Sequence, residues 1–261
     1  MNKFLHPYHL VTESPWPLLG SLVLINMMVG FIKWFNEYQN FLLFLSYFCL
    51  LMIIMQWWRD VIRESTLQGN HTLKVLNGLR MGMILFILSE LMFFLSFFWA
   101  YFHMFLSPSI ELGNLWPPKE ILIFNPYNIP LLNTLILLSS GMTITWCHYS
   151  ILKSNSLNSN ISIIMTLLLG LIFILFQYME YSESYFSISD SVFGSIFFMA
   201  TGFHGLHVMI GVIFIFISMN RLFNYHYSKF HHFGFEAASW YWHFVDVVWL
   251  FLYIFMYWLF Y

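Results

Sequence analysis

The amino-acid sequence predicts an all-α membrane protein with seven transmembrane helices, and its composition and its long apolar runs carry that prediction. Of the 261 residues, 60% are hydrophobic and only 8% are charged, and the mean hydropathy is +0.72. A soluble domain carries about 25% charged residues, so this chain has too few charges to cover a water-facing surface. Backbone exposed to lipid must be hydrogen-bonded within helices or a closed barrel. The apolar runs are continuous and do not alternate in polarity, which favours helices over a barrel.

Seven apolar runs are long enough to cross about 30 Å of hydrocarbon. They cover approximately residues 16–34, 41–58, 73–105, 129–152, 161–181, 192–223 and 234–258. The connections between them contain turn residues, including Trp116-Pro117-Pro118 and a polar Ser/Asn stretch over residues 154–160. No connection is long enough for a soluble domain, so we predict a single integral membrane domain over residues 1–261.

The positions of the charges predict an orientation. Most of the Lys and Arg residues fall on the side that holds the N-terminus: Lys3, Arg59, Arg63, Lys74, Arg80, Lys153, Arg221 and Lys229. The other side holds Lys33 and Lys119, and it collects Glu37, Glu111, Glu120, Glu180, Glu183 and Asp190. The positive-inside rule places the N-terminal side in the cytoplasm or the mitochondrial matrix. The formal net charge of −2 argues against a nucleic-acid partner.

Glu90 is the most conspicuous single residue, because it lies within the apolar run 84–98 with no cation one helical turn away. An ionised acid is costly in that setting. One interpretation is a carboxylate that handles protons or gates a path. The other is a protonated side chain whose hydrogen bond to a neighbouring helix fixes their packing.

His204 and His207 are three positions apart on one predicted helix face, a spacing that could direct two imidazoles at one metal ion. The alternative, which we favour, is that they form hydrogen bonds between helices brought close by Gly202, Gly205 and Gly211. A second polar group in the last span includes His243 and Asp246. No complete metal-ligand set and no paired haem ligands can be identified, so we predict no metal and no catalytic residue.

Basic and aromatic residues on the N-terminal side offer a further candidate site. Arg and His side chains flanked by Trp can hold anionic lipid headgroups. The alternative is that they only set the topology and extend along the helices toward water. Charge pattern alone leaves both interpretations open.

Several strings in the chain resemble mitochondrial cytochrome c oxidase subunit III. They are residues 56–65 (QWWRDVIRES), 82–90 (GMILFILSE), 200–208 (ATGFHGLHV), 231–237 (HHFGFEA) and 240–250 (WYWHFVDVVWL). The resemblance extends over the whole chain, in order and without large gaps. The chain departs from the family pattern at residues 145–149 (TWCHY), where the family usually has Ala and a second His around His148, and at its C-terminus.

The resemblance implies a core subunit of respiratory complex IV. That complex transfers electrons from cytochrome c to oxygen, forms water and pumps protons. The family has seven helices, the first two separated from the other five by a V-shaped cleft filled with lipid. Haem a, haem a3 and copper are expected in partner subunits I and II, beside accessory subunits, and no redox centre is expected in this chain. The expected location is the mitochondrial inner membrane, with the N-terminus in the matrix and the C-terminus in the intermembrane space.

The resemblance also assigns residues. Glu90 matches the buried carboxylate of the family's third helix, while His204, His207, His243 and Asp246 are assigned to helix packing or a polar network. The expected ligands are phospholipids: cardiolipin, phosphatidylglycerol or phosphatidylethanolamine. The predicted lipid-binding set is Trp58, Arg63, Glu64, His71, Arg80, Arg221, His226, Lys229 and His231.

Two other function classes fit parts of the sequence. An independent transporter or channel would use Glu90 with His204 and His207, and the purified chain would then conduct in liposomes. A subunit of a related quinol oxidase would differ in its electron donor.

Overall fold

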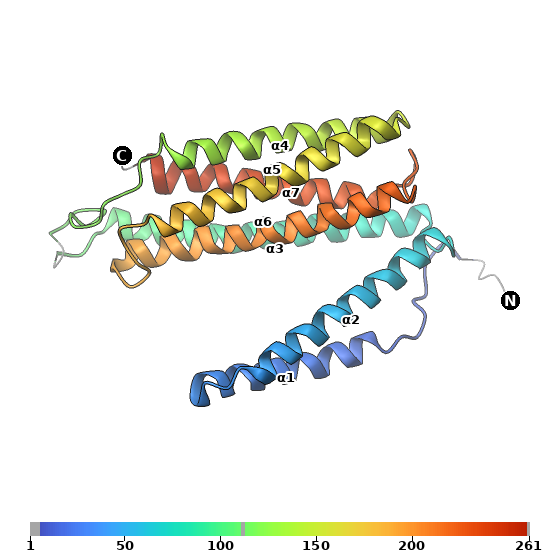
Figure 1. The fold of residues 1–261 in the computed structure, drawn as a ribbon, viewed down its shortest axis with the longest axis horizontal. Helices are drawn as coiled ribbons and strands as arrows, with labels where there is room; N and C mark the ends of the chain where they lie inside the picture. Colours follow the sequence, from blue (N-terminus) through green and yellow to red (C-terminus); the bar gives the residue numbers. More distant parts are fainter. Residues whose placement is uncertain (1–5, 111–112, 260–261) are drawn as a thin grey trace. The chain divides into compact units, whose positions relative to one another are not determined.

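The computed structural model describes residues 6–110 and 113–259 and contains seven long helices in that part of the chain (Figure 1). They are α1 (Trp16–Glu37), α2 (Phe41–Thr66), α3 (Leu73–Leu106), α4 (Ile129–Leu152), α5 (Ser156–Ser182), α6 (Ser191–Phe223) and α7 (Phe233–Leu252), the last continued by a π-helical segment, η2 (Tyr253–Trp258). Each is long and apolar enough to cross a membrane. The predicted all-α, seven-helix class is confirmed.

The chain divides into two compact units, residues 1–79 and 80–261. In the first unit, α1 and α2 pack against each other as a helical hairpin. Gly30 permits this packing, since a Cβ atom there would lie 3.0 Å from backbone atoms of Leu43. The turn between the helices uses Tyr38 with a φ of 56°, the left-handed conformation that commonly ends a helix.

In the second unit, α4, α5, α6 and α7 pack around a common core. Trp242 of α7 is fully buried there, and its indole lies against Gly170 of α5 and Gly211 of α6. A Cβ atom at either glycine would come within 2.8–2.9 Å of the indole ring. The part of α3 that belongs to the second unit, from Arg80 onward, packs against α6 through aromatic side chains. Phe93 of α3 and Phe203 of α6, for example, have ring centroids 5.0 Å apart.

The largest differences from the predicted helix boundaries lie at the end of α2 and at the start of α5. Helix α2 continues from about residue 58 to Thr66, because Arg59 and Arg63 both lie within ion-pair distance of Asp60 on the same helix. Helix α5 begins at Ser156, inside the stretch predicted as a turn, and the side chain of Asn155 caps it by accepting from the Asn158 backbone amide. A search for apolar runs detects the membrane-spanning part of a helix and misses its polar ends.

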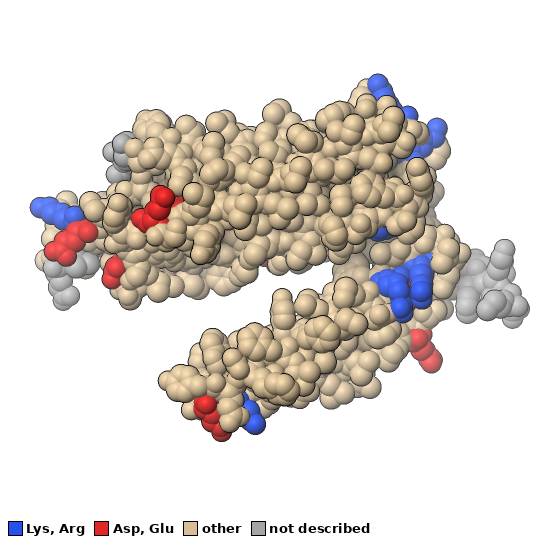
Figure 2. All heavy atoms as spheres, viewed as in Figure 1, with Lys and Arg blue, Asp and Glu red and all other residues tan. Residues whose placement is uncertain are grey.

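Charge separates toward opposite ends of the second unit (Figure 2). On the face shown, Lys and Arg gather mainly at one end, while acidic residues are visible at the other. This separation agrees with the predicted arrangement of loops within this unit. Lys3 and Glu111, which entered that prediction, lie outside the described residues.

Candidate functional site

Glu90 and His207 form a direct pair between α3 and α6. The Glu90 Oε2 atom lies 2.8 Å from His207 Nε2, and the two side chains retain only 25% and 12% of their exposure. The His207 ring also lies close to Phe94, at 5.1 Å between ring centroids. The sequence showed no cation within a helical turn of Glu90, and its partner comes from another helix.

The hydrogen bonds of His207 indicate that one proton lies between the His207 Nε2 atom and the Glu90 carboxyl group. The Nδ1 atom lies 2.7 Å from the backbone oxygen of Phe203, and a carbonyl oxygen can only accept. Nδ1 therefore carries a hydrogen, and Nε2 of a neutral ring offers a lone pair. A 2.8 Å contact to Glu90 then requires a proton, either on the carboxyl group or on the imidazole. The site thus has the chemistry of a shared, transferable proton.

His204 does not join His207 in a common site. Its Nε2 atom donates to the backbone oxygen of Val245 on α7, at 3.1 Å, and its ring packs against Trp249 with centroids 5.2 Å apart. His207 bonds instead to Glu90 of α3. The interpretation of these two histidines as ligands of one metal ion is therefore wrong, because their rings reach different helices.

The glycines near these histidines have unequal roles. Gly211 does allow close packing. A Cβ atom at Gly205 would meet no described atom within 4 Å. A Cβ atom at Gly202 would have the Tyr181 hydroxyl as its nearest neighbour, at 3.9 Å. The expectation that all three bring helices together holds for Gly211 alone.

His243 and Asp246 both lie against Gly141 of α4. A Cβ atom at Gly141 would be 3.3 Å from Asp246 Oδ2 and 3.7 Å from the His243 ring. Asp246 is buried, and its Oδ1 atom has no hydrogen-bond partner among the described residues. The two side chains thus lie between α4 and α7, and their assignment to a polar network stays a prediction.

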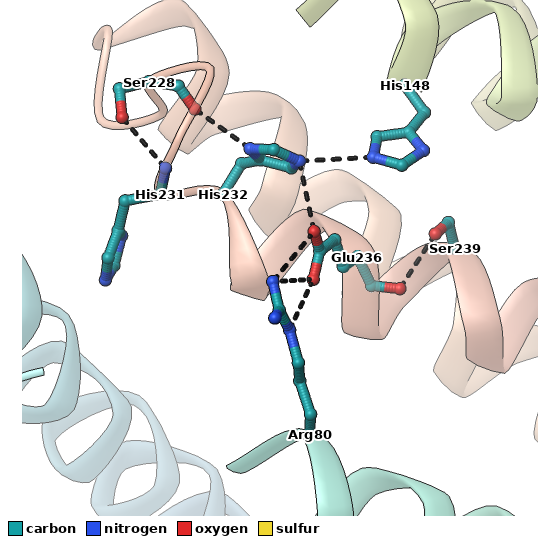
Figure 3. A network of polar contacts seen from close by, with 7 residues as sticks. All are labelled: Arg80, His148, Ser228, His231, His232, Glu236 and Ser239. Atoms are coloured by element: carbon teal, nitrogen blue, oxygen red, sulfur yellow. Dashed lines mark hydrogen bonds and ion pairs between the residues drawn. The ribbon is translucent and has the colours of Figure 1, made fainter. Parts of the chain in front are cut away.

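Arg80, His148, His232 and Glu236 form a second polar cluster, at the end of the unit where α4 ends and α7 begins (Figure 3). His232 Nε2 lies 3.2 Å from His148 Nε2 and 3.2 Å from Glu236 Oε1. Arg80 binds both oxygens of the Glu236 carboxylate, with Nε donating to Oε2 at 3.2 Å and Nη2 donating to Oε1 at 3.4 Å. Sequence analysis grouped Arg80 with lipid-binding residues and did not predict these partners.

The predicted lipid-binding residues divide between the two units. In the first unit, Trp58 is exposed, and Arg63 lies 3.7 Å from Asp60. Glu64 is buried, where it binds His9 at 3.1 Å and the Thr12 hydroxyl at 3.2 Å. The Glu64 carboxylate thus holds the N-terminal segment against α2, a role that differs from direct contact with lipid.

His71, also in the first unit, has its ring 6.1 Å from that of His9. In the second unit, the Arg221 guanidinium stacks over the ring of Tyr227 at 4.6 Å. Lys229 lies over the ring of Phe230 at 5.0 Å.

The loop from residue 224 to 232 carries the remaining members of the set. Burial raises the pKa of the Tyr227 phenol, an effect that the positive charge of Arg221 partly opposes. Partial burial and the neighbouring Arg221 charge both lower the pKa of His226. The backbone amide of His231 donates to the Ser228 hydroxyl at 3.0 Å, which orders this loop.

Sequence analysis missed the pairing of Glu180 with Tyr257. Glu180 was assigned to a charged surface, yet it is 1% exposed, and the Tyr257 hydroxyl donates to its Oε1 atom at 2.6 Å. The one available signal was Gln177, three positions earlier on the same face of α5 and also buried. Two polar residues at that spacing indicate a polar face directed into the protein.

Comparison with known proteins identifies the family. The family model for cytochrome c oxidase subunit III matches residues 6–261. The chain belongs to the cytochrome c oxidase subunit III family. It is 57% identical to cytochrome c oxidase subunit 3 of Drosophila yakuba and 57% identical to that of Pisaster ochraceus, each over 253 residues and 97% of both chains. It is 52% identical to that of Pelomedusa subrufa over 258 residues and 99% of both chains.

Membership in the subunit III family makes this chain a subunit of an oxidoreductase complex. The seven apolar helices make it a multi-pass membrane protein. The resemblance seen in the sequence strings is thereby confirmed over nearly the full length.

Proposed function

We propose that this chain is the core subunit III of a mitochondrial oxidase that passes electrons from cytochrome c to oxygen, forms water and pumps protons. Haem a, haem a3 and copper belong to subunits I and II, and this chain stabilises subunit I without a redox centre of its own. The observation that carries the proposal is the family match over residues 6–261. The location is the inner membrane, with the N-terminus in the matrix and the C-terminus in the intermembrane space.

The Glu90–His207 pair supports a part in proton uptake. A carboxylate and an imidazole that hold one proton at 2.8 Å can release it and take it up again without a large structural change. We propose that the pair buffers protons for the complex, while its hydrogen bond also joins α3 to α6.

Phospholipids are the proposed ligands of the basic and aromatic residues. Arg63, at 54% side-chain exposure, has the accessible guanidinium that a headgroup phosphate needs, and so does half-exposed Arg80, at 43%. The cleft expected between the first two helices and the other five, and its filling with lipid, stay predictions.

One purification tests the central proposal. The complex is captured in mild detergent with an antibody to this chain, and its visible spectrum, metal content and oxidation of cytochrome c are measured. Haem a and copper should co-purify with cytochrome c oxidation. A colourless, metal-free protein would contradict the proposal, and oxidation of a quinol in place of cytochrome c would assign the chain to a different oxidase.

Lipid binding is tested on the same preparation. The phospholipid retained per haem is measured in the wild type and in the Arg63→Ala and Arg221→Ala variants, with Lys33→Ala as the control on the other side. Loss of a defined phospholipid in the arginine variants alone supports the lipid sites, and unchanged retention contradicts them.

A further inference from the structure

His148, His232 and Glu236 direct three metal-binding atoms at one point. These atoms, His148 Nε2, His232 Nε2 and a Glu236 carboxylate oxygen, all lie within 4.8 Å of one another. Two of the separations are 3.2 Å. Ligands of a tetrahedral zinc ion at about 2.0–2.1 Å are separated by about 3.3 Å. The two separations that involve His232 match this value, and the His148 and Glu236 ligand atoms lie within 4.8 Å of each other.

The orientation of His232 is the second observation that points to a cation. Its Nδ1 atom lies 3.0 Å from the backbone oxygen of Ser228, so Nδ1 carries the hydrogen and a neutral ring presents a lone pair at Nε2. That lone pair faces the Glu236 Oε1 atom at 3.2 Å (Figure 3). A proton or a metal ion between these two acceptors would stabilise their contact, and His148 Nε2, at 3.2 Å from His232 Nε2, and Arg80 Nη2, at 3.4 Å from Oε1, are the other polar groups that reach them.

The surroundings resemble the outer shell of a metal site. Ligating histidines commonly donate their second ring nitrogen to a backbone carbonyl, as His232 does to Ser228. Arg80 orients the Glu236 carboxylate by donating from Nε to Oε2 at 3.2 Å and from Nη2 to Oε1 at 3.4 Å, and the same Oε1 atom lies 3.2 Å from His232 Nε2. The Glu236 side chain keeps 13% of its exposure, so the carboxylate is not fully closed off from water.

We propose that His148, His232 and Glu236 form a binding site for a divalent transition-metal ion of the zinc type. Two imidazoles and one carboxylate are a ligand set that zinc accepts, with water completing four-fold coordination. The site joins the end of α4 to the start of α7, so a bound ion would link these helices. Sequence analysis predicted no metal, because His148 lies 84 positions from His232.

The test is a zinc titration of the intact oxidase that contains this chain. The complex is washed with a chelator and titrated with Zn²⁺ alone, and bound zinc per haem is measured by elemental mass spectrometry. The wild type should bind one more equivalent than the His148→Gln variant, or bind it at least about 100-fold more tightly, since loss of even an outer-shell partner costs 10–100-fold. The control is His103→Gln, an exposed histidine in the last turn of α3 that belongs to no proposed site, which should match the wild type.

Equal zinc binding by the wild type and His148→Gln would overturn the proposal and leave a proton between His232 and Glu236. If His148→Gln does not assemble, the wild type alone gives the answer. Zinc should then protect His148 from modification by diethyl pyrocarbonate, measured by peptide mass spectrometry, while His103 stays reactive. Equal reactivity of His148 with and without zinc would overturn the proposal.

Discussion

Glu90 pairs with a histidine that lies 117 positions away in the chain. Replacement by Gln should preserve assembly, because an amide N–H can donate to His207 Nε2 in place of the carboxyl proton. Replacement by Ala should destabilise the protein by about 1–3 kcal/mol, because the half-buried imidazole nitrogen then has no partner. The measurement is thermal denaturation of the assembled complex, followed through its haem absorbance.

The same variants separate the two interpretations of Glu90. If the pair handles protons, Glu90→Gln should assemble normally and lose activity progressively during sustained turnover. If the pair only joins helices, turnover should match the wild type. A Gln variant as unstable as the Ala variant would show that the amide cannot replace the carboxyl group, and it would contradict the shared-proton geometry.

Among the residues that the structure describes, Ser140 is the only hydrogen-bond partner of the buried Trp242 indole. The Trp242 Nε1 atom donates to the Ser140 hydroxyl at 2.9 Å, and both residues are fully buried. Ser140→Ala leaves the indole N–H unpaired and should cost about 1–3 kcal/mol. The matched control is Ser139→Ala, since Ser139 makes the same bond to its own helix three residues back and serves no indole. Equal stability of the two variants in thermal denaturation would show that the bond contributes nothing.

The sequence allowed unusual residues to be recognised, but it did not allow the residues that they contact to be predicted. The sequence identified Glu90 and His207 as unusual because each polar group sits in an apolar run, but a run holds no information about which helices meet. Glu180 escaped notice because it lies near a predicted loop, where an acid needs no explanation. Its burial depends on Tyr257, which reaches it from the end of the chain.

At the scale of helices, Gly211 sets the spacing between α6 and α7. Gly211→Ala would place a methyl group 2.9 Å from the Trp242 ring, so the helices must separate, at a cost of about 1–3 kcal/mol. Gly205→Ala, on the same helix, meets nothing within 4 Å and should be neutral or slightly stabilising because Ala favours helix. Thermal denaturation of both variants checks the difference, and equal effects would contradict a role of Gly211 in packing.

The helices themselves were predictable because lipid and backbone chemistry leave few alternatives. A run of about 20 apolar residues determines that a span exists, and all seven were found in this way. The ends were less predictable, since ends are fixed by local polar contacts such as the cap at Asn155. The closing π-helical turn over Tyr253–Trp258 gave no sequence signal, because the apolar run continues through it without a break.

At the scale of the whole molecule, the distribution of charge predicts how the chain crosses the membrane. Lys153 and Lys229 lie in the loops after α4 and α6, and Arg221 lies in the last turn of α6, while the loop between α5 and α6 carries Glu183 and Asp190. Positive residues are retained on the matrix side. The two loops that flank α5 should therefore face opposite compartments.

Single cysteines placed at exposed positions on either side of α5 test this orientation. In mitochondria with the outer membrane opened, an impermeant maleimide should label Ser189→Cys, which the charge distribution predicts to face the intermembrane space. It should label Ser156→Cys only after the inner membrane is permeabilised. Native Cys147 is buried and Cys49 lies within α2, so background labelling should be low. The reverse pattern would place the basic loops in the intermembrane space and invert the topology. It would also move the His148–His232–Glu236 cluster, beside the basic loop, to the intermembrane-space side, where zinc would reach it without crossing the inner membrane.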